Sequence, residues 1–291
     1  MTSMQFAIIT PSYHVDFNRC AMLAESIRRY VPKDVVHYII VDGRDRELFA
    51  GLASEQTRLI VQDELVPERL WRPSFAPRWR VSWRMPPIRG WIWQQITKLS
   101  IASIPADAYM LVDSDCLFTA PFDPRTLVKD GRVPLFREEN AWYKADKNTQ
   151  NWHRHAARIL ALPRRSEPYA TGYVGPHVFW RRDVLEALDR HLGSKGPKGM
   201  ARRIAFCPTF SEYVFYGVFA EQVLGLEQAG HYVFDREIVH NYWPEVALSR
   251  TELDLFKGRM LPDKVMVHIN GKSRTPEADI RKVFMPEAAG R

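Results

Sequence analysis

The chain carries the run Tyr109-Met-Leu-Val-Asp-Ser-Asp-Cys-Leu-Phe118, in which two aspartates one residue apart, Asp113 and Asp115, follow four apolar residues. A short apolar run bounded by polar residues is typical of a buried strand. A strand that ends at Val112 places both aspartates on the turn at its carboxyl end, where open α/β sheets bind their ligands. The run therefore predicts an α/β fold and marks the edge of the sheet at which we expect a ligand.

The two carboxylates on this turn are potential metal ligands. Two of them can converge on one hard divalent cation, and Mg²⁺ or Mn²⁺ takes one or two carboxylates together with phosphate oxygens and water. Asp113 and Asp115 are therefore candidate ligands of a metal ion beside a diphosphate. The alternative is that Asp-Ser-Asp only forms a turn, since both residue types are common in turns.

A repeating pattern of strands and helices precedes this turn. We expect strands at 5–10, 35–41 and 59–61, and helices at 16–30 (capped by Asp16), 46–53 and 91–104. Such alternation is typical of a parallel sheet with right-handed crossovers, so residues 1–120 are predicted to be a Rossmann-like, nucleotide-binding half. Neither G-x-G-x-x-G nor a Walker P-loop is present, so phosphate must be held in another way.

The alternation weakens after the turn. We expect strands at 134–137, 178–180, 239–243 and 265–269, helices at 151–162, 183–191 and 213–228, and a flexible basic connector at 193–199. Residues 121–291 are predicted to be an acceptor-side half, added to the first half within one continuous domain.

The run Tyr109–Phe118 resembles the D-x-D segment of GT-A nucleotide-sugar glycosyltransferases. Three other segments agree with these enzymes in order: Ile8–Tyr13, Trp93–Lys98 and Val267–Lys272. The resemblance implies a GT-A-type Rossmann-like fold, with a mixed, mainly parallel sheet flanked by helices and an acceptor-side lobe. It also implies a metal-dependent glycosyltransferase of the hexosyltransferase type, similar to uncharacterised proteins of bacterial polysaccharide clusters. Its cofactor would be Mn²⁺ or Mg²⁺, its donor a nucleotide-sugar with a UDP-sugar favoured, and its acceptor a saccharide or lipid-linked saccharide.

Donor-binding residues are expected where the first two strands end. The carboxyl ends of neighbouring parallel strands line one crevice, so Tyr13 could stack on a base and Asp42 could accept a hydrogen bond from base or ribose. The resemblance implies the same roles and adds Thr10 and Pro11 to the donor site. A tyrosine at the core edge and a turn aspartate are the alternatives.

Two further segments are assigned by the resemblance. Lys98 shares a face of the helix at 91–104 with Gln94 or Gln95, and the resemblance implies that polar residues of this helix, Gln95 and Lys98 among them, contact the sugar or the D-x-D. A solvated lysine is the alternative. Glu212 falls in the first turn of the helix capped by Ser211. The resemblance implies that Glu212 is the catalytic base of an inverting enzyme, whereas favourable interaction with the helix dipole is the structural alternative.

The segment His268-Ile-Asn-Gly-Lys272 resembles the H-x-x-G-x-x-K-P-W segment of retaining family-eight transferases. There the histidine is the third metal ligand, which implies that His268 binds the cation and Lys272 the diphosphate. The segment departs from that pattern because Lys272 follows the glycine at once and K-P-W is absent. The anomeric outcome of the transfer is therefore open, and a buried core histidine is the alternative for His268.

Composition limits the classes of protein. The 291 residues are 46% hydrophobic, which is enough for a large core, and the net charge of +7 favours anionic partners. No apolar run is long enough to span a bilayer, so we expect a cytoplasmic protein that makes at most a peripheral contact with an anionic inner membrane. Three scattered cysteines without C-x-x-C predict free thiols.

The segment from Arg69 to Arg89 interleaves tryptophan and arginine with prolines, which are expected to break any regular element. Such a segment can stack bases, line a sugar-diphosphate site, or pack as a loop on the core. A non-catalytic nucleic-acid-binding protein is therefore one alternative function, although no recognised nucleic-acid fold accompanies the segment and we expect no such partner. A metal-dependent phosphotransferase or nuclease is the other, and it is disfavoured because two-metal sites need more acidic ligands.

Overall fold

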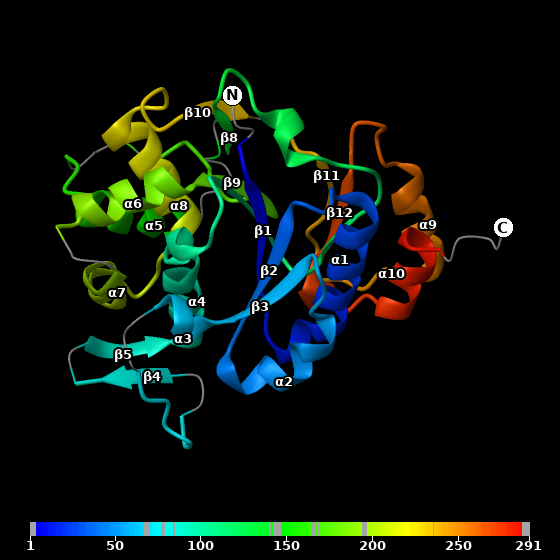
Figure 1. Cartoon of the computed structure of the whole chain (residues 1–291), viewed down its shortest axis with the longest axis horizontal. Coiled ribbons are helices and arrows are strands. Elements are labelled where there is room, and N and C mark those ends of the chain that lie inside the picture. Colours follow the sequence, from blue (N-terminus) through cyan, green and yellow to red (C-terminus); the bar gives the residue numbers. More distant parts are fainter. Residues whose placement is uncertain are drawn as a thin grey trace. The chain divides into compact units, whose positions relative to one another are not determined.

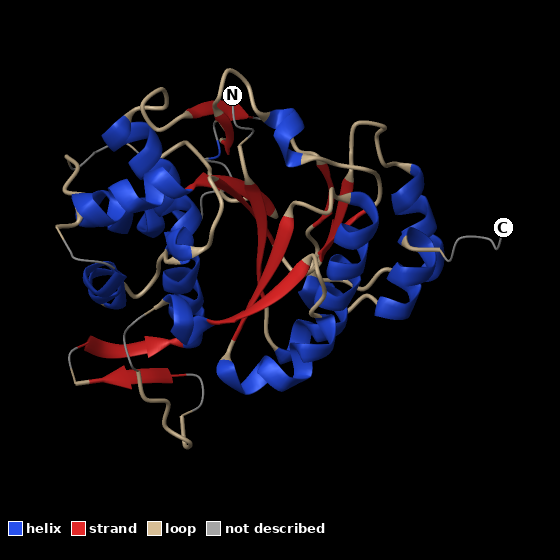
Figure 2. Ribbon diagram, viewed as in Figure 1, coloured by secondary structure: helices blue, strands red, loops and turns tan. Residues whose placement is uncertain are grey.

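The computed structural model describes residues 4–66, 70–76, 79–83, 85–139, 141, 147–163, 167, 169–193, 197–234 and 236–286. Strands and helices alternate through most of this chain (Figures 1 and 2). The α/β class predicted from the sequence is therefore present.

The largest sheet has five strands in the order β3-β2-β1-β6-β9. These strands are β1 (Phe6–Pro11), β2 (Val36–Val41), β3 (Thr57–Val61), β6 (Ala108–Val112) and β9 (His177–Arg181). β1 and β2 pair in parallel. Every residue of β1 and β6 is buried, which is typical of strands covered on both faces of a parallel sheet. The apolar start of the Tyr109–Phe118 run is thus a central strand because both of its faces are hydrophobic.

The chain divides into two compact units, each assembled from separate segments. The first unit contains Met1–Phe6, Ile60–Met110 and Leu127–Asp235, and the second contains Ala7–Leu59, Leu111–Thr126 and Arg236–Arg291. The predicted division at residue 120 into donor and acceptor halves concerns ligand binding, and it stays a prediction.

The second unit has a small sheet of its own. Its remaining elements are α1 (Phe17–Tyr30), α2 (Arg46–Phe49), β7 (Cys116–Phe118), β11 (Val239–Tyr242), α9 (Arg250–Gly258), β12 (Met266–Ile269), α10 (Glu277–Phe284) and 3-10 helices at His14–Asp16, Gly43–Asp45, Ala50–Leu52, Pro124–Leu127 and Gly271–Ser273. The sheet order is β11-β12-β7, with β12 parallel to β11 and antiparallel to β7. Leu117, Leu253, Val267 and Phe284 belong to one buried cluster, which joins this sheet to α9 and α10.

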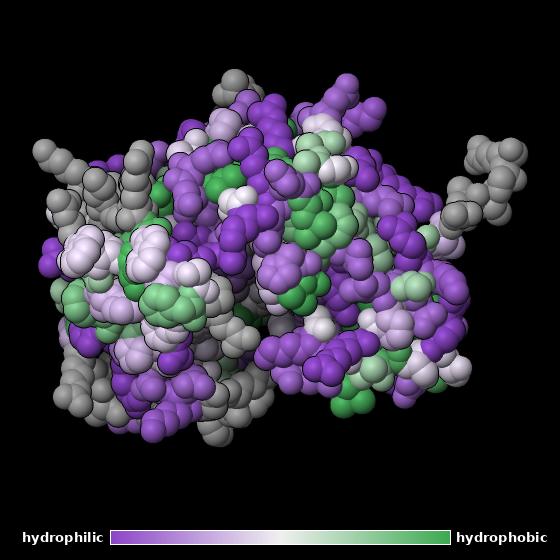
Figure 3. Space-filling view, turned by 90° about the horizontal axis from the view of Figure 1, so that it is seen from below, coloured by the Kyte–Doolittle hydropathy of each residue, from purple (hydrophilic) through white to green (hydrophobic). Residues whose placement is uncertain are grey.

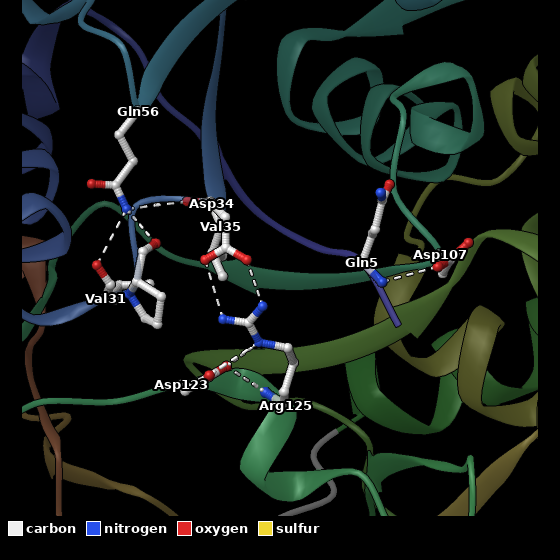
Figure 4. Close-up of polar contacts among 9 residues, drawn as sticks. Gln5, Val31, Asp34, Val35, Gln56, Asp107, Asp123 and Arg125 are labelled. Carbon is white, nitrogen blue, oxygen red and sulfur yellow. Dashed lines mark hydrogen bonds and ion pairs between the residues drawn. The ribbon is translucent and has the colours of Figure 1, made fainter. Parts of the chain in front are cut away.

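Polar contacts hold the segment that leads into β2 (Figure 4). The Arg125 guanidinium donates to the carboxylates of both Asp34 and Asp123, with 2.8 Å between Nε and Asp123 Oδ1. The buried Gln56 amide donates to the carbonyls of Pro32 and Val35, at 2.9 and 3.2 Å. These bonds satisfy backbone and carboxylate groups that would otherwise rely on water, so they fix the entry into the strand.

The first unit is mostly helical. It contains α3 (Gln62–Leu65), β4 (Trp79–Ser82), β5 (Met85–Arg89), α4 (Gly90–Leu99), β8 (Val133–Phe136), α5 (Lys147–Ile159), α6 (Arg182–His191), α7 (Pro197–Ala205), α8 (Glu212–Val218), a π-helix (Phe219–Leu224), β10 (His231–Phe234) and a 3-10 helix at Ile101–Ser103. β8 pairs in parallel with β10. The Ser211 hydroxyl accepts from the Val214 amide at the start of α8, as its predicted capping role requires.

Several predicted boundaries were wrong. Residues 79–82 and 85–89 form the antiparallel hairpin β4–β5, although prolines were expected to prevent regular structure. Prolines are tolerated there because Pro86 and Pro87 lie in β5, which is an edge strand of the two-stranded sheet. The helix predicted at 213–228 ends at Leu224, where Gly225 adopts a φ of 82°. Residues 197–199 of the predicted connector open α7, since proline suits the first turn of a helix.

Two other predicted helices differ from the structure only in where the α-helix ends. The helix predicted at 91–104 ends at Leu99 and is followed by a 3-10 helix, and the helix predicted at 46–53 is likewise α2 followed by a 3-10 helix. Arg69, Pro77, Arg78, Arg84 and residues 194–196 lie outside the described residues.

The three cysteines, Cys20, Cys116 and Cys207, are buried and unpaired, as predicted. Among the described residues, no helix has both the length and the hydrophobicity needed to cross a lipid bilayer. The face drawn in Figure 3 is mostly hydrophilic, and separate hydrophobic patches interrupt it.

Candidate functional site

The Asp113-Ser114-Asp115 turn joins β6 to β7 in the second unit. Because β6 ends at Val112, both aspartates follow its carboxyl end, as predicted. The Cys116 amide donates to the Asp113 carbonyl at 3.1 Å and closes the turn. A buried strand on each side fixes the backbone, so the two carboxylates have a defined position.

The Asp115 carboxylate meets two residues of the C-terminal segment. Its Oδ2 accepts from the Gly271 amide at 2.8 Å and lies 3.4 Å from Nε2 of His268. The antiparallel pairing of β7 with β12 places His268 opposite Cys116, next to Asp115. This pairing explains why two predicted ligands that are distant in sequence come together.

Burial and the neighbouring polar groups shift the pKa of Asp115 in opposite directions. Burial raises the pKa of its carboxyl, but the hydrogen bond and charge interaction with His268, the Gly271 amide and the Arg19 guanidinium outweigh burial. The pKa of Asp115 therefore lies below its usual value. A carboxylate that stays ionised is the form that binds a cation.

A third carboxylate, Asp16, belongs to this group, although the sequence indicated only a helix cap. Its side chain makes no capping hydrogen bond. Burial, followed by the negative charges of Asp115 and Asp113, raises the pKa of Asp16 to about 6. A Cβ on Gly271 would lie 3.6 Å from Asp115 Oδ2 and 3.8 Å from Asp16 Oδ1. Glycine thus leaves room between two carboxylates, and the signal for Asp16 was its place shortly after the first strand.

His268 itself is buried, with 2% of its surface exposed. Within the described part of the chain its Nδ1 has no hydrogen-bond partner, and the exposed Trp243 packs its ring 4.5 Å from the imidazole. A core histidine would normally satisfy both ring nitrogens. Among the described residues Nδ1 of the buried His37 also has no partner, so the orphaned nitrogen does not separate a metal ligand from a core histidine. The nitrogen that faces Asp115 is Nε2, which is therefore the atom placed to share a cation with that carboxylate.

These groups fit a hard divalent cation that also takes ligands from its substrate. Carboxylate oxygens suit Mg²⁺ and Mn²⁺, and both cations accept phosphate oxygens and water in the remaining positions. Within the described ranges no three His, Cys, Asp or Glu side chains are close enough to hold a metal ion by themselves. A cation bound here would take its remaining ligands from phosphate oxygens and water. The assignment of Asp113, Asp115 and His268 as ligands stays a prediction.

The predicted donor residues differ in how accessible they are. Tyr13 is 44% exposed, and burial, with a smaller effect from the charge of Asp16, raises the pKa of its phenol. Asp42 follows β2, and its carboxylate accepts from the backbone and side chain of Arg44. The Thr10 hydroxyl is fully buried, with 3.0 Å between its oxygen and a ring nitrogen of His37.

Pro11 is buried as well. Of the four predicted donor contacts, Tyr13 and Asp42 have side chains near the surface, whereas the side chains of Thr10 and Pro11 serve the core. Sequence position at the end of a strand does not separate these two cases.

Lys272 lies in the 3-10 helix that follows β12. Its side chain is 76% exposed, and its ammonium lies 3.0 Å from the Glu245 carboxylate. An exposed pair of this kind is weak and is easily exchanged for another anion. The predicted contact of Lys272 with phosphate stays a prediction.

The other predicted residues form a cluster in the first unit. The Lys98 ammonium lies 2.8 Å from the Glu212 carboxylate and donates to the Tyr213 hydroxyl at 2.7 Å. The Gln95 side-chain oxygen accepts from the Glu212 amide at 3.2 Å. Lys98, Glu212 and Gln95 are all buried. Helices α4 and α8 thus bring together three residues that the sequence indicated separately, and Tyr213 is a member that sequence reasoning missed.

Comparison with known proteins places this geometry in context. The model of a family of unknown function, DUF6492, matches residues 5–244. The structure of mouse xyloside xylosyltransferase 1 in its apo form is similar over 93% of this chain and 99% of that chain, with 11% identity and a TM-score of 0.50. No curated protein matches the sequence.

The apo structure of WbbM, a bifunctional glycosyltransferase, is similar over 98% of this chain and 50% of that chain. Its identity is 10% and its TM-score 0.50, so this chain spans about half of the WbbM chain. Likeness at such low identity concerns the fold. The predicted GT-A-type fold, a mainly parallel sheet flanked by helices, is confirmed.

Proposed function

The chain belongs to the DUF6492 family, and we propose that it is a metal-dependent glycosyltransferase, which moves a sugar from a nucleotide-sugar donor to a saccharide acceptor. The observation that carries the proposal is the contact of Asp115 with His268 and the Gly271 amide. It joins the D-x-D turn to the C-terminal segment within one unit. The likeness of the fold to two glycosyltransferase structures supports it.

The cation is the first part of the proposal. Asp115 and His268 would hold Mn²⁺ or Mg²⁺, and Asp113 and Asp16 add negative charge around them. When bound, such a cation neutralises the charge that develops on a nucleoside diphosphate as it leaves the sugar. The Gly271 amide orients one oxygen of Asp115, and the absence of a side chain at residue 271 leaves space beside the carboxylates.

The donor is the second part. Tyr13 presents an exposed ring on which a nucleobase can stack, and Asp42 offers a carboxylate that can accept from base or ribose. Both follow neighbouring parallel strands. A UDP-sugar is the proposed donor, with Lys272 as a phosphate contact once it leaves Glu245.

The acceptor is the third part. We propose a saccharide or lipid-linked saccharide of a bacterial surface polysaccharide, whose hydroxyl attacks the anomeric carbon of the donor. An inverting transfer needs a base for this hydroxyl, typically worth about 10²–10⁴ in rate, and Glu212 is the residue proposed for that role. Inverted configuration in the product, measured by NMR, is the expected result. Retained configuration would remove the need for a base and leave Glu212 a structural residue.

Isothermal titration calorimetry tests the metal-diphosphate site. UDP should bind the parent protein only when Mn²⁺ or Mg²⁺ is present. In Asp115→Asn the cation should no longer promote UDP binding, because the substitution removes the ionised ligand. Asp254→Asn is a matched control, since Asp254 is an exposed carboxylate of the same unit that forms an ion pair with Arg250 within α9. Undiminished, cation-dependent binding of UDP by Asp115→Asn would overturn the assignment.

A further inference from the structure

The strands β4 and β5 lie side by side near α4 (Figure 1). Arg80 and Ile88 are paired across the hairpin and are both buried. Arg80 donates to Asp63 and Gln62, so its charge is neutralised inside the first unit. Because side chains alternate along a strand, the adjacent pair of Trp79 and Arg89 points to the opposite face.

The outward face carries aromatic side chains. Trp79 pairs with Arg89 across the strands, and the Arg89 guanidinium lies 5.3 Å above the Trp79 ring. At Val81, where the register between β4 and β5 shifts, the backbone forms a bridge with Trp71, so Trp71 lies along the outer edge of β4.

Large aromatic residues around this face are unusually exposed. The exposed fractions are 63% for Trp71, 84% for Phe75, 105% for Trp83 and 48% for Trp91. Trp71 and Phe75 also contact each other edge to face, with 6.5 Å between ring centroids. Trp71 and Phe75 form an exposed pair, and Trp83 in the hairpin turn and Trp91 at the start of α4 expose further rings. Exposed apolar area of this amount marks an interaction surface, because it is unfavourable in water.

The charge of the same segment selects the partner. Between Arg69 and Trp91 the sequence contains six arginines and neither aspartate nor glutamate. Arg80 is neutralised internally, whereas Arg89 is exposed beside the aromatic rings. The sequence of this segment is therefore basic, and among its described arginines Arg89 places an exposed guanidinium beside Trp79, which complements an anionic partner.

The edges of the hairpin exclude one common kind of partner. Pro86 and Pro87 lie within β5 and lack the N–H that a neighbouring strand would need. On the side of β4, the bridge with Trp71 already uses the backbone of Val81. A peptide that adds a strand to the hairpin is therefore disfavoured, and the side chains of the outward face are the contact surface.

We infer that the outward face of β4–β5, with Trp71, Phe75, Trp83 and Trp91, docks on an anionic lipid bilayer. Tryptophan prefers the interface between headgroups and acyl chains, where its ring is buried and its N–H stays hydrated. Arginine adds electrostatic attraction to anionic headgroups. Docking of this kind is independent of the proposed sugar transfer, and it would hold the protein at a membrane surface.

Vesicle co-sedimentation of the whole chain tests the inference. The parent should bind vesicles of phosphatidylcholine mixed with phosphatidylglycerol more strongly than vesicles of phosphatidylcholine alone, and added salt should weaken the difference. Trp83→Ser should lower the partition about tenfold, since burial of even half an indole is worth at least that much. Arg89→Glu should lower binding to the anionic vesicles only.

Phe206→Ser is the matched control, because Phe206 is 61% exposed in the same unit but lies outside the hairpin. It should bind vesicles as the parent does. An unchanged melting temperature of Trp83→Ser would show that the fold is intact. Equal partition of Trp83→Ser and parent would overturn the inference. So would a parent that ignores vesicles but binds single-stranded DNA through Trp83, because the face would then serve nucleic acid.

Discussion

The pair of Lys98 and Glu212 allows a prediction with a definite magnitude. If Glu212 acted only as a favourable charge in the first turn of α8, Glu212→Gln would cost about 0.3–1 kcal/mol of stability. The structure predicts a larger loss. The two charged groups lie 2.8 Å apart with 9% and 6% of their side chains exposed. Removing one partner of a buried pair is typically worth about 3–5 kcal/mol, because the other charge is left without compensation.

Neighbouring groups set where in this range the loss should fall. The Tyr213 hydroxyl and the face of its ring, 2.7 and 4.4 Å from the Lys98 ammonium, remain in the variant. They stabilise the cation in part, so we expect a loss near 3 kcal/mol. Equilibrium unfolding in urea at neutral pH, followed by tryptophan fluorescence, measures the difference in the free energy of unfolding.

A double variant that lacks both charges separates the cost of an unpaired buried charge from the loss of the pair itself. Lys98→Met combined with Glu212→Leu removes both charges, and it should restore most of the stability that Glu212→Gln loses. A loss below about 1 kcal/mol in Glu212→Gln would refute the reasoning and leave helix capping as the sole structural role. Catalysis is read separately, because a base predicts a fall in turnover of about 10²–10⁴ for the folded variant.

Two further predictions concern Asp16 and Gly217. The pKa of Asp16 is raised to about 6 in the folded protein, so its ionisation lowers stability as the pH rises from about 4 to 6. Asp16→Asn should therefore stabilise the cation-free protein at pH 7 by about 1 kcal/mol, a value reduced by solvent screening, and the gain should vanish near pH 4 in thermal unfolding. For Gly217→Ala, the new Cβ would lie 2.3 Å from the Tyr173 ring. Overpacking of about 1–3 kcal/mol should then exceed the helix-propensity gain of about 1 kcal/mol. Gly258→Ala, where no atom lies within 4 Å, is the control and should unfold in urea no more easily than the parent.

The central strands and the start of α1 were predictable because local signals agreed there. The run ending at Val112 is apolar and short, and the turn residues mark its end. The hairpin β4–β5 was not predictable in this way. Prolines indicate a break in regular structure, but the inward pair of Arg80 and Ile88 and the edge position of β5 outweigh that signal.

The candidate site was predictable only in part. Asp115 and His268 could be named from their motifs, whereas their contact depends on the antiparallel pairing of β7 with β12, which no local pattern specifies. Asp16 gave the signal of a helix cap and turned out to face the same carboxylates. Burial of Lys98 and Glu212 was not evident either, because charged residues are rarely buried unless they meet a partner, and that partner lies on another helix.

The charges around Asp115 also bear on the order in which ligands bind. The negative charges of Asp113 and Asp115 raise the pKa of Asp16. The positive charge of Arg19 lowers the pKa of both Asp16 and Asp115. Arg19 is held by the carbonyls of the C-terminal segment, so it cannot turn toward a ligand without losing those bonds. A diphosphate that approached three carboxylates would meet repulsion that one fixed guanidinium does not cancel. The donor should therefore bind together with a divalent cation or after it, and nucleotide affinity in the absence of metal should rise when Asp16 is neutralised.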